Sequence, residues 1–306
     1  MNGVLIIDKP AGMTSHDVVN RLRRILGQRA VGHLGTLDPM ATGVLPMVVG
    51  CFTRLAQFYL DSEKMYEGTI RFGFATDTYD AEGEPTSTPQ PVELQREAME
   101  ALAAKFRGLV EQMPPPFSAK KIQGVPAYKL ARKHKEVVLK PVQVEIKEFE
   151  ILGVAVDRVQ FRARVASGTY VRSIAHDMGQ ALGCGAHLES LRRTGVAEFR
   201  IEDAHTLDEL AGTAGKSRVE DSSGWEDVFV HPRKLLPRLP SVTADEATAA
   251  RIRSGRTVNL PDLSRARQVK VFAGQRDLIA IATRVAGTLF HPKMVLSPSP
   301  VTASVG

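Results

Sequence analysis

The sequence predicts a protein of the α+β class with two domains. Its 306 residues exceed the ~100–200 residues of a typical domain, and a content of 43% hydrophobic and 24% charged residues is that of a globular protein. Predicted strands and helices alternate irregularly along the chain. Few strand–helix units follow one another at the spacing of a parallel sheet, which favours α+β over a doubly wound fold.

Hydrophobic periodicity places the elements of the larger domain. Apolar runs or alternation predict the strands 4–7, 67–74, 142–152 and 159–165. Helical spacing predicts the helices 15–26, 93–106 and 171–182. The first helix has the clearest start, because Thr14 or Ser15 can cap it directly ahead of apolar residues at helical spacing.

Turn-rich segments divide the chain. The stretch 236–240, with two prolines, separates a larger domain, residues 1–238, from a small one, residues 241–296. The small domain is expected to be a β-barrel of short strands, including 257–260, 269–272 and 278–283. The remaining turn-rich segments are a polar loop at 80–91, a flexible surface insertion at 212–224 and a disordered tail at 297–306.

The net charge of +6 is concentrated near the C-terminus. Residues 241–306 hold nine lysines and arginines against four acidic residues, so only about one net positive charge belongs to the rest of the chain. A small basic unit beside a neutral one is typical of a nucleic-acid-binding appendage. An ordinary, well-solvated basic surface is the alternative.

Several classes of protein are set aside. Two cysteines, Cys51 and Cys184, form no disulfide framework and no zinc motif, which favours the reducing cytoplasm. No apolar run approaches the length of a membrane span, and no basic region precedes the apolar residues at 4–7. The glycines at 183–185 and 215 lack the partners of a dinucleotide or phosphate loop, so we expect neither a cofactor nor a metal.

The segment 32–46 is a candidate site because it combines three glycines and two prolines with a single acid, Asp38. Glycine permits close backbone approach, and the proline after Asp38 favours an extended conformation. A carboxylate on such a stiffened loop can be presented to a ligand. Alternatively, the segment is a plain turn in which Asp38 caps a local backbone group.

A second candidate is Arg172, at the start of the predicted helix 171–182 and just after a turn at Gly168. Arginine can grip a carboxylate at two points and hold it ionised. A contact between Arg172 and Asp38 would form a reactive centre without metal. The alternative is an arginine that faces solvent.

Together with four further blocks, these segments resemble the TruB family of tRNA pseudouridine synthases, in order from the first residues to about Arg200. The blocks are GVLIIDKP (3–10), GH (32–33), GTLDPMATG (35–43), K-x-Y (64–66), T-D-T-x-D (76–80), SGTYVR (167–172) and GCGAHL-x-x-LRR (183–193). The basic C-terminal unit resembles the PUA-like RNA-binding domain of bacterial members by position and charge.

The resemblance implies a mixed, largely antiparallel sheet flanked by helices, followed by a small PUA-like β-barrel. Residues 113–138 match the position of the family's thumb insertion, which grips the RNA. Asp38 corresponds to the catalytic aspartate, Arg172 to its ion-pair partner and Tyr66 to the aromatic residue that stacks on the target base. Further substrate-binding residues are implied by the same motifs: Lys9, His33, Asp80, Tyr170 and Leu191. Ser167 stands where some members have lysine, so it receives no catalytic role.

The implied activity is isomerisation of a uridine to pseudouridine in the T loop of tRNA, at position 55. The reaction neither gains nor loses atoms, so no cofactor is needed. The implied partner is the T arm of tRNA, and the protein is expected to be a cytoplasmic monomer that binds neither DNA nor a membrane. Two other readings stay open: guide-RNA-dependent modification of ribosomal RNA, and a non-catalytic RNA-binding or chaperone role.

Overall fold

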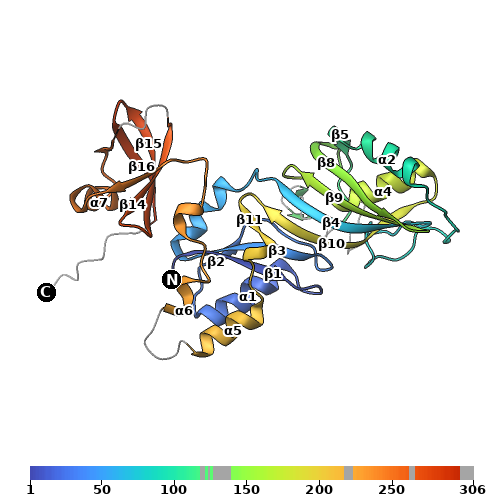
Figure 1. Ribbon diagram of the computed structural model, residues 1–306, viewed down its shortest axis with the longest axis horizontal. Helices are drawn as coiled ribbons and strands as arrows, with labels where there is room; N and C mark the ends of the chain where they lie inside the picture. The colour runs from blue at the N-terminus through green and yellow to red at the C-terminus, as the bar shows by residue number, and fades with distance from the viewer. Residues whose placement is uncertain (118–120, 123–124, 127–138, 217–222, 262–265, 297–306) are drawn as a thin grey trace.

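The computed structural model describes residues 1–117, 121–122, 125–126, 139–216, 223–261 and 266–296. The chain forms an elongated molecule in which a large curled sheet is followed by a small C-terminal unit at one end (Figure 1). The predicted thumb insertion at 113–138 lies mostly outside the described residues, as does the predicted tail at 297–306. Of the insertion, residues 121–122 and 125–126 form the short antiparallel pair β6–β7.

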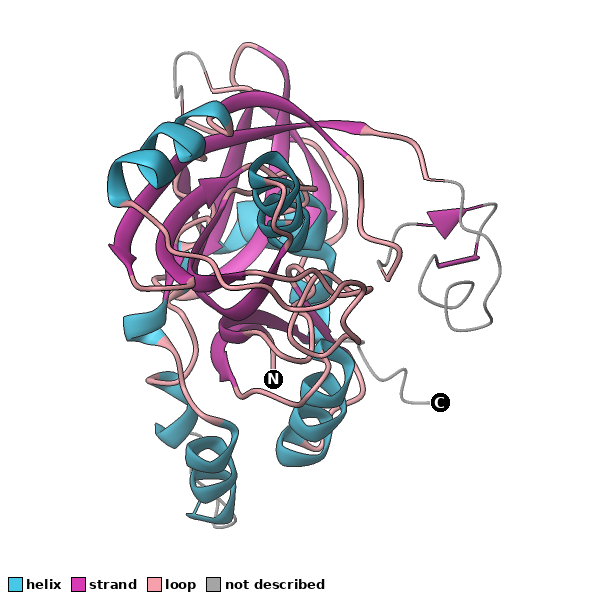
Figure 2. Cartoon of the chain, turned by 90° about the vertical axis from the view of Figure 1, so that its right-hand side faces the viewer, coloured by secondary structure: helices cyan, strands magenta, loops and turns pink. Residues whose placement is uncertain are grey.

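The large sheet has nine strands and is antiparallel except where β10 meets β3. Its main path runs β1-β3-β10-β4-β9-β8-β5, with β2 beside β3 and β11 beside β10. In chain order the strands are β1 (Gly3–Lys9), β2 (Val31–His33), β3 (Thr42–Val49), β4 (Lys64–Phe72), β5 (Gly108–Gln112), β8 (Val142–Val154), β9 (Arg158–Val165), β10 (Ala186–Val196) and β11 (Phe199–Arg200). Figure 2 shows how strongly this sheet curls. The predicted mixed, largely antiparallel α+β fold is confirmed.

Three longer helices flank the sheet: α1 (Ser15–Leu26), α2 (Arg96–Lys105) and α4 (Val171–Leu182). The start of α1 is a capping box, in which the side chains of Thr14 and Asp17 each accept the other's backbone N–H. The helix ends at Gly27, whose left-handed conformation (φ 61°) suits glycine. Among the described residues, no helix is both long and apolar enough to cross a lipid bilayer.

Strand β1 explains why its sequence is a continuous apolar run. Leu5 and Ile7 belong to the main core of the sheet, whereas Val4 and Ile6 belong to a second apolar cluster on the opposite face. Because a strand presents alternate residues to opposite faces, burial on both sides removes the usual alternation.

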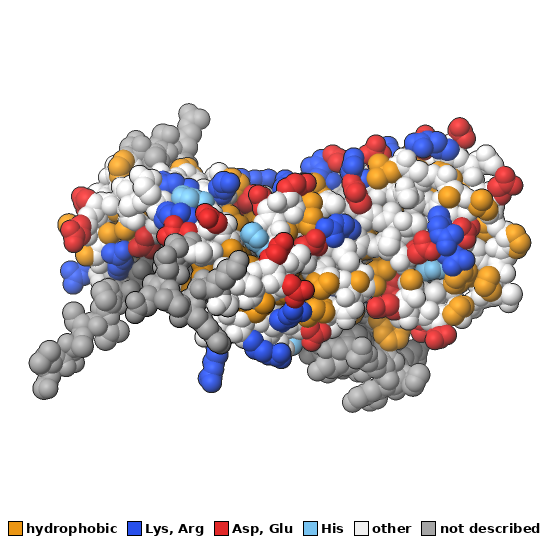
Figure 3. All heavy atoms as spheres, turned by 60° about the horizontal axis from the view of Figure 1, so that its bottom comes forward, with side chains coloured by type: hydrophobic (Ala, Val, Ile, Leu, Met, Phe, Trp, Pro, Cys, Tyr) orange, Lys and Arg blue, Asp and Glu red, His pale blue; other side chains and the backbone are white. Residues whose placement is uncertain are grey.

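The C-terminal unit is a five-stranded sheet in the order β12-β14-β15-β16-β13, with one helix. Its elements are β12 (Ser241–Ala244), α7 (Glu246–Arg253), β13 (Val258–Asn259), β14 (Gln268–Ala273), β15 (Asp277–Ala286) and β16 (Leu289–Val295). Phe272, Leu278 and Met294 lie in the same apolar cluster as Val4 and Ile6, so the two units share a core. On the face in Figure 3, basic and acidic side chains of this unit lie side by side rather than in one basic patch.

The remaining elements lie outside the two sheets. They are the 3-10 helices η1 (Gly50–Phe58), η2 (Ile201–Asp203) and η3 (Pro232–Lys234) and the helices α5 (Leu207–Lys216) and α6 (Ser223–Glu226). Lys270 of β14 is buried and donates from Nζ to the backbone carbonyls of Arg233 and Leu235, at 2.9 and 2.6 Å. This contact fixes the connecting segment to the C-terminal sheet.

Two sequence-based expectations are wrong. Residues 212–216, expected in a flexible insertion, belong to α5, which packs on α1 and buries Leu207 and Leu210 in the main core; residues 217–222 lie outside the described part. The segment 32–46 was expected to be irregular, but residues 42–49 form β3 in the centre of the sheet. Pro46 pairs with Ile6 of β1 and is compatible with this strand although it lacks an N–H, because the pairing of β3 with β10 ends at Gly43 and that with β2 begins at Met47.

Candidate active site

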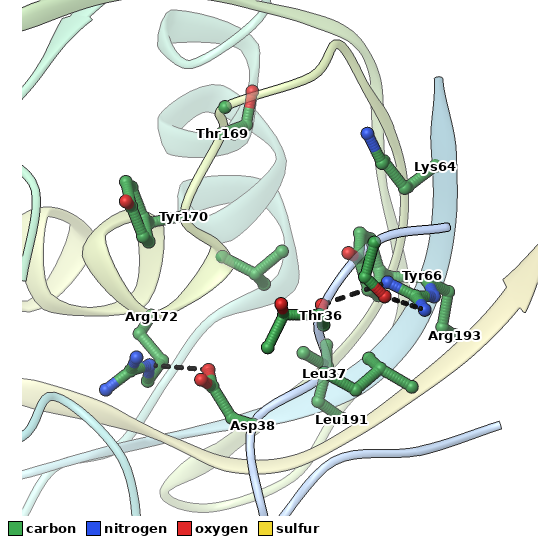
Figure 4. A pocket seen from close by; sticks show the side chains of 13 residues that line it. Thr36, Leu37, Asp38, Lys64, Tyr66, Thr169, Tyr170, Arg172, Leu191 and Arg193 are labelled. Atoms are coloured by element: carbon green, nitrogen blue, oxygen red, sulfur yellow. Dashed lines mark hydrogen bonds and ion pairs between the residues drawn. The ribbon is translucent and has the colours of Figure 1, made fainter. Parts of the chain in front are cut away.

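A cavity of about 240 Å³ opens where the loop 34–41, the strands β4 and β10 and the N-terminus of α4 meet (Figure 4). Its lining side chains are Thr36, Leu37, Asp38, Lys64, Tyr66, Thr169, Tyr170, Val171, Arg172, Leu191 and Arg193. The two candidates of the sequence, the segment 32–46 and Arg172 with the turn before it, therefore lie side by side although well over a hundred residues separate them. Five of the predicted site residues line this cavity: Asp38, Tyr66, Tyr170, Arg172 and Leu191.

One side of the loop 34–41 is held by Arg193, which is buried at the centre of the sheet with 1% of its surface exposed. Its guanidinium donates to the backbone carbonyls of Val44 (2.7 Å), Thr36 (3.2 Å) and Gly35 (2.9 Å). The close approach of β3 to β10 requires glycine at position 43, since a Cβ there would lie 2.2 Å from the Arg193 carbonyl oxygen. Arg193 thus sets the conformation of the loop that carries Asp38.

The other side of the loop is held by Lys9 and Ser15. Lys9 is fully buried, and its Nζ donates to the carbonyls of Pro10 (2.8 Å), Met13 (2.7 Å) and Pro39 (3.1 Å). Burial lowers the pKa of Lys9 to about 8. The Ser15 hydroxyl accepts the N–H of Leu37 at 2.8 Å. Lys9 was predicted to bind substrate, but its position beneath the loop leaves it no exposed surface, so its place is that of a loop support.

Asp38 and Arg172 form the predicted ion pair. Arg172 Nε lies 2.9 Å from Asp38 Oδ2, and the Arg172 side chain is 7% exposed whereas that of Asp38 is 38% exposed. The contact that the structure shows is the one at Nε, and a two-point grip of Asp38 stays a prediction. The Nη atoms of Arg172 meet Asp80 Oδ2 (3.3 Å) and the carbonyls of Thr78 and Phe117, each at 3.0 Å. Arg172 therefore joins the loop of Asp38 to the turn that contains Thr78 and Asp80 and to the segment at Phe117.

Asp80 lies behind Arg172 and does not line the cavity. Its Oδ1 accepts hydrogen bonds from the Thr78 hydroxyl (2.6 Å) and the Glu82 N–H (3.1 Å), and the residue is 3% exposed. In the structure Asp80 Oδ2 contacts Arg172 at 3.3 Å, and the predicted substrate contact of Asp80 stays a prediction. Desolvation raises the pKa of Asp38, the Arg172 guanidinium opposes this rise, and the negative charge of Asp80 adds to it.

The aromatic residues Tyr66 and Tyr170 face the cavity from opposite sides, with Leu191 beside Tyr66 (Figure 4). Tyr170 is fixed by Gln112, whose side chain accepts the Tyr170 N–H at 2.8 Å and donates to the Tyr170 carbonyl at 3.0 Å. His33, at the end of β2, is not among the lining residues; burial and the charge of Arg193 lower its pKa. A substrate contact of His33 stays a prediction.

Arg193, Gln112 and Lys64 were not predicted as site residues. Arg193 shares a face of β10 with Leu191, and Lys64 shares a face of β4 with Tyr66, because alternate residues of a strand point the same way. The two-residue alternation of β10 and β4 was therefore a signal that could have placed Arg193 and Lys64 in the site. It was missed because β10 was not predicted and the predicted strand at 67–74 began after Tyr66.

The cavity combines a partly exposed carboxylate with aromatic and apolar walls. Such walls can hold a planar base, and the arginine behind Asp38 stabilises its anionic form. Within the described ranges, no three His, Cys, Asp or Glu side chains are grouped to hold a metal ion. The arrangement suits a reaction at a flipped-out base that proceeds through one carboxylate.

Comparison with known proteins identifies the family. The N-terminal domain model of the TruB family of pseudouridylate synthases matches residues 23–171, and a tRNA pseudouridylate synthase B C-terminal domain model matches residues 172–235. The tRNA pseudouridine synthase B of Solibacter usitatus is 50% identical over 299 residues, covering 97% of this chain and 100% of that protein. That of Burkholderia lata is 40% identical, covering 97% of this chain and 89% of that protein.

Solved structures agree with this assignment. A Cbf5-Nop10-Gar1 complex contains a chain that is 26% identical, with a TM-score of 0.72, covering 97% of this chain and 85% of that chain. A chain of the archaeal box H/ACA sRNP Nop10-Cbf5 complex is 25% identical, with a TM-score of 0.70 and coverage of 97% and 86%. The family matches, the near-full-length relatives and the shared fold together show that this chain belongs to the TruB family of pseudouridine synthases.

Proposed function

We propose that this protein isomerises uridine to pseudouridine in tRNA, at position 55 of the T loop. The observation that carries the proposal is the Asp38 carboxylate, which opens into the cavity beside Tyr66 and is held from behind by Arg172 at 2.9 Å. The names of the relatives, tRNA pseudouridine synthase B, support tRNA as the substrate. The T loop and position 55 follow from the family motifs of the sequence.

The chemistry needs a carboxylate, a base platform and a closed pocket. The bond between N1 of uracil and C1′ of ribose breaks, the base turns, and C5 bonds to C1′. The hydrogen on C5 then leaves as a proton and N1, which carries none in uridine, gains one, so the product is an isomer of the substrate. Asp38 acts at the sugar or the base during bond cleavage, as a nucleophile or as an anionic stabiliser. Tyr66 stacks on the base, and its hydroxyl is a candidate for the proton transfer at C5.

The target uridine must leave its stack to reach Asp38. Extrusion of a base costs a few kcal/mol, which stacking on an aromatic platform offsets in part. Tyr66 and Tyr170 supply two such rings on either side of the cavity. We further propose that the protein binds the T arm as a cytoplasmic monomer, that residues 1–238 form the catalytic domain, and that residues 241–296 form a PUA-like domain that contacts RNA.

The test is the purified protein on an unmodified tRNA transcript, with neither accessory proteins nor guide RNA. We expect one pseudouridine, mapped at position 55 by carbodiimide labelling and primer extension. Modification only after a guide RNA is added would instead support guide-dependent action on another RNA, and tight tRNA binding without any isomerisation would support a chaperone role.

The matched variant is Asp38→Asn, which retains the shape of the side chain but not its charge. We expect it to bind tRNA with nearly unchanged affinity and to form no pseudouridine, because the amide provides neither a nucleophile nor an anion. Turnover near the wild-type rate in this variant would rule out Asp38 as the catalytic residue.

A further inference from the structure

The turn that backs Arg172 contains a strained residue. Tyr79 has a φ of 66°, one of three positive values at non-glycine residues in the described part of the chain. Its N–H donates to the carbonyl of Thr76 at 3.3 Å, which closes the turn 76–79. A left-handed conformation is unfavourable for a bulky side chain, and it persists only where the surroundings hold it.

The ring of Tyr79 is held by His176 of α4. The two rings stack with centroids 3.8 Å apart and planes 14° from parallel. The Nδ1 atom of His176 is buried and has no hydrogen-bond partner within the described residues. The stack, rather than a hydrogen bond at Nδ1, therefore orients this imidazole.

The same turn supplies the acceptors that orient Arg172. The Thr78 carbonyl and Asp80 Oδ2, on either side of Tyr79, both contact Arg172 Nη1, at 3.0 and 3.3 Å. Arg172 and His176 are four residues apart on α4 and so lie on the same helical face. The turn thus meets α4 at two points, one helical turn apart: the guanidinium contact and the ring stack.

A third contact ties the turn to the sheet. The Tyr79 carbonyl accepts the Leu188 N–H of β10 at 3.0 Å, and the Ala81 N–H donates to the Leu188 carbonyl, also at 3.0 Å. The backbone of the turn is therefore fixed along one edge. Without the ring stack, the turn would keep this edge and the contacts with Arg172 but lose its second contact with α4.

We propose that Tyr79 and His176 are positioning residues for the catalytic pair of Arg172 and Asp38. Their stack sets the distance between the turn 76–80 and α4, and this distance places the Thr78 and Asp80 oxygens on Arg172. Arg172 in turn directs Nε at Asp38. The role of Tyr79 and His176 in catalysis rests on the proposed function, whereas their effect on the position of Arg172 does not.

The first test compares Tyr79→Asn with Tyr79→Phe. Asparagine tolerates positive φ but removes the ring, whereas phenylalanine retains the ring. We expect Tyr79→Asn to slow the single-turnover rate on tRNA by about ten- to a hundred-fold, with unchanged tRNA affinity, since a small misplacement of reacting groups has effects of that size. Tyr79→Phe is expected to recover most of the rate. Circular dichroism confirms folding, and Tyr79→Gly, which adopts positive φ freely, serves if the asparagine variant does not fold.

The second test measures the position of Arg172 relative to Asp38 through the pKa of Asp38, and it needs no turnover. The carboxyl carbon resonance of Asp38, assigned with Asp38→Asn, gives its pKa by NMR titration. We expect Tyr79→Asn to raise this pKa above the wild-type value, because a displaced guanidinium stabilises the carboxylate less. The matched control is Phe74→Leu, which removes another ring contact with a histidine, His187, at 4.6 Å, and leaves the turn intact. We expect it to leave the Asp38 pKa unchanged.

The third test is a double-variant cycle of Tyr79→Asn and His176→Leu. If the two residues act through one stack, the double variant is no slower than the slower single variant, and His176→Phe restores the rate. Multiplicative losses would contradict action through the stack. A folded Tyr79→Asn protein with the wild-type rate and the wild-type pKa of Asp38 would overturn the proposal. A wild-type protein without isomerase activity would contradict the proposed function alone, because the NMR titration still decides the positioning.

Discussion

Two groups of cationic side chains lie on opposite faces of the same sheet. The pocket cations, Lys9, Arg172 and Arg193, are buried, and most of their hydrogen bonds go to backbone carbonyls. The outer ladder, formed by Lys147, Arg158, Arg162 and Arg164 of β8 and β9, is exposed and pairs with carboxylates. The alternation of side chains along the strands separates the two groups. Tyr66 of β4 faces the cavity, whereas the next residue, Glu67, points to the other face, where it pairs with Arg162.

The difference shows that the partner of a cation, rather than the number of its contacts, decides what the cation does. A buried lysine or arginine that serves several carbonyls fixes the path of a loop, since its removal leaves those carbonyls without partners. An exposed ion pair exchanges its partner readily for water and contributes little to stability. We therefore expect substitutions of pocket cations to affect both fold and activity, and substitutions in the ladder to affect neither.

The largest effect is expected for Arg193→Met. It leaves the carbonyls of Gly35 and Thr36 in the Asp38 loop and of Val44 in β3 without their donor, at about 1–3 kcal/mol for each buried group, though such losses are not fully additive. We expect the free energy of unfolding to fall by about 3 kcal/mol and the single-turnover rate to fall by more than about 100-fold. Urea unfolding and rapid-quench kinetics measure the two effects.

The matched control is the neighbouring Arg192, which is exposed and pairs with Asp8 at 2.7 Å. Arg192→Met should leave the urea midpoint close to that of the wild type. Equal losses of stability in the two variants would show that burial and carbonyl partners do not distinguish these arginines.

A smaller effect is expected for Arg172→Lys, which retains the positive charge. Lysine cannot present Nε to Asp38 while it also reaches the oxygens of Asp80, Thr78 and Phe117. Loss of one charged hydrogen bond, about 1.5–3 kcal/mol, corresponds to about ten- to a hundred-fold in rate. Wild-type single-turnover kinetics in the folded variant would show that Arg172 does not orient the carboxylate.

A pH shift is expected from the environment of Asp38. Desolvation raises its pKa above the ordinary value of 3.8, so the free protein holds a protonated, inactive carboxyl at a higher pH than a solvated aspartate does. The single-turnover rate should therefore rise with pH through a midpoint above 3.8 and then reach a plateau. Circular dichroism at each pH separates this titration from acid unfolding, and a midpoint at or below 3.8 contradicts the prediction.

The smallest effect is expected in the outer ladder. Arg162→Gln removes contacts with Glu67 and Glu150, but the arginine side chain is 55% exposed. We expect no measurable change in the urea midpoint or in turnover. A loss comparable with that of Arg193→Met would show that the two faces of the sheet are energetically alike, which would break the comparison.

The sequence predicted the elements with a clear local signal. Helices 15–26 and 171–182 were placed with their observed bounds, because their apolar period and flanking glycines are local properties. The contact of Asp38 with Arg172 was predicted and is observed. Strand β10 was missed because its charged residues, including Arg192 and Arg193, hide the alternation that burial would otherwise produce.

What sequence reasoning could not provide is the direction of each buried polar group. Nothing local to Lys9 shows that its amine turns under the loop to reach Pro39, thirty positions away. Likewise, nothing local to Gln112 shows that it clamps Tyr170, which is 58 positions away. These contacts depend on the order of strands in the sheet, and that order is set by packing across the whole domain.

The shared apolar cluster bears on how the chain is made. Val4 and Ile6, in the first strand of the large sheet, pack in one cluster with Phe272, Leu278 and Met294 of the C-terminal unit, which follow them by more than 260 positions. A growing chain can complete the main core of the curled sheet, yet the second cluster lacks its C-terminal members until the C-terminal unit has left the ribosome. During that interval the part of the cluster that the C-terminal unit covers is open to association with other chains. Protein whose synthesis stops before β12 should therefore accumulate as aggregates or be bound by chaperones, even though every residue of the cavity has already been made.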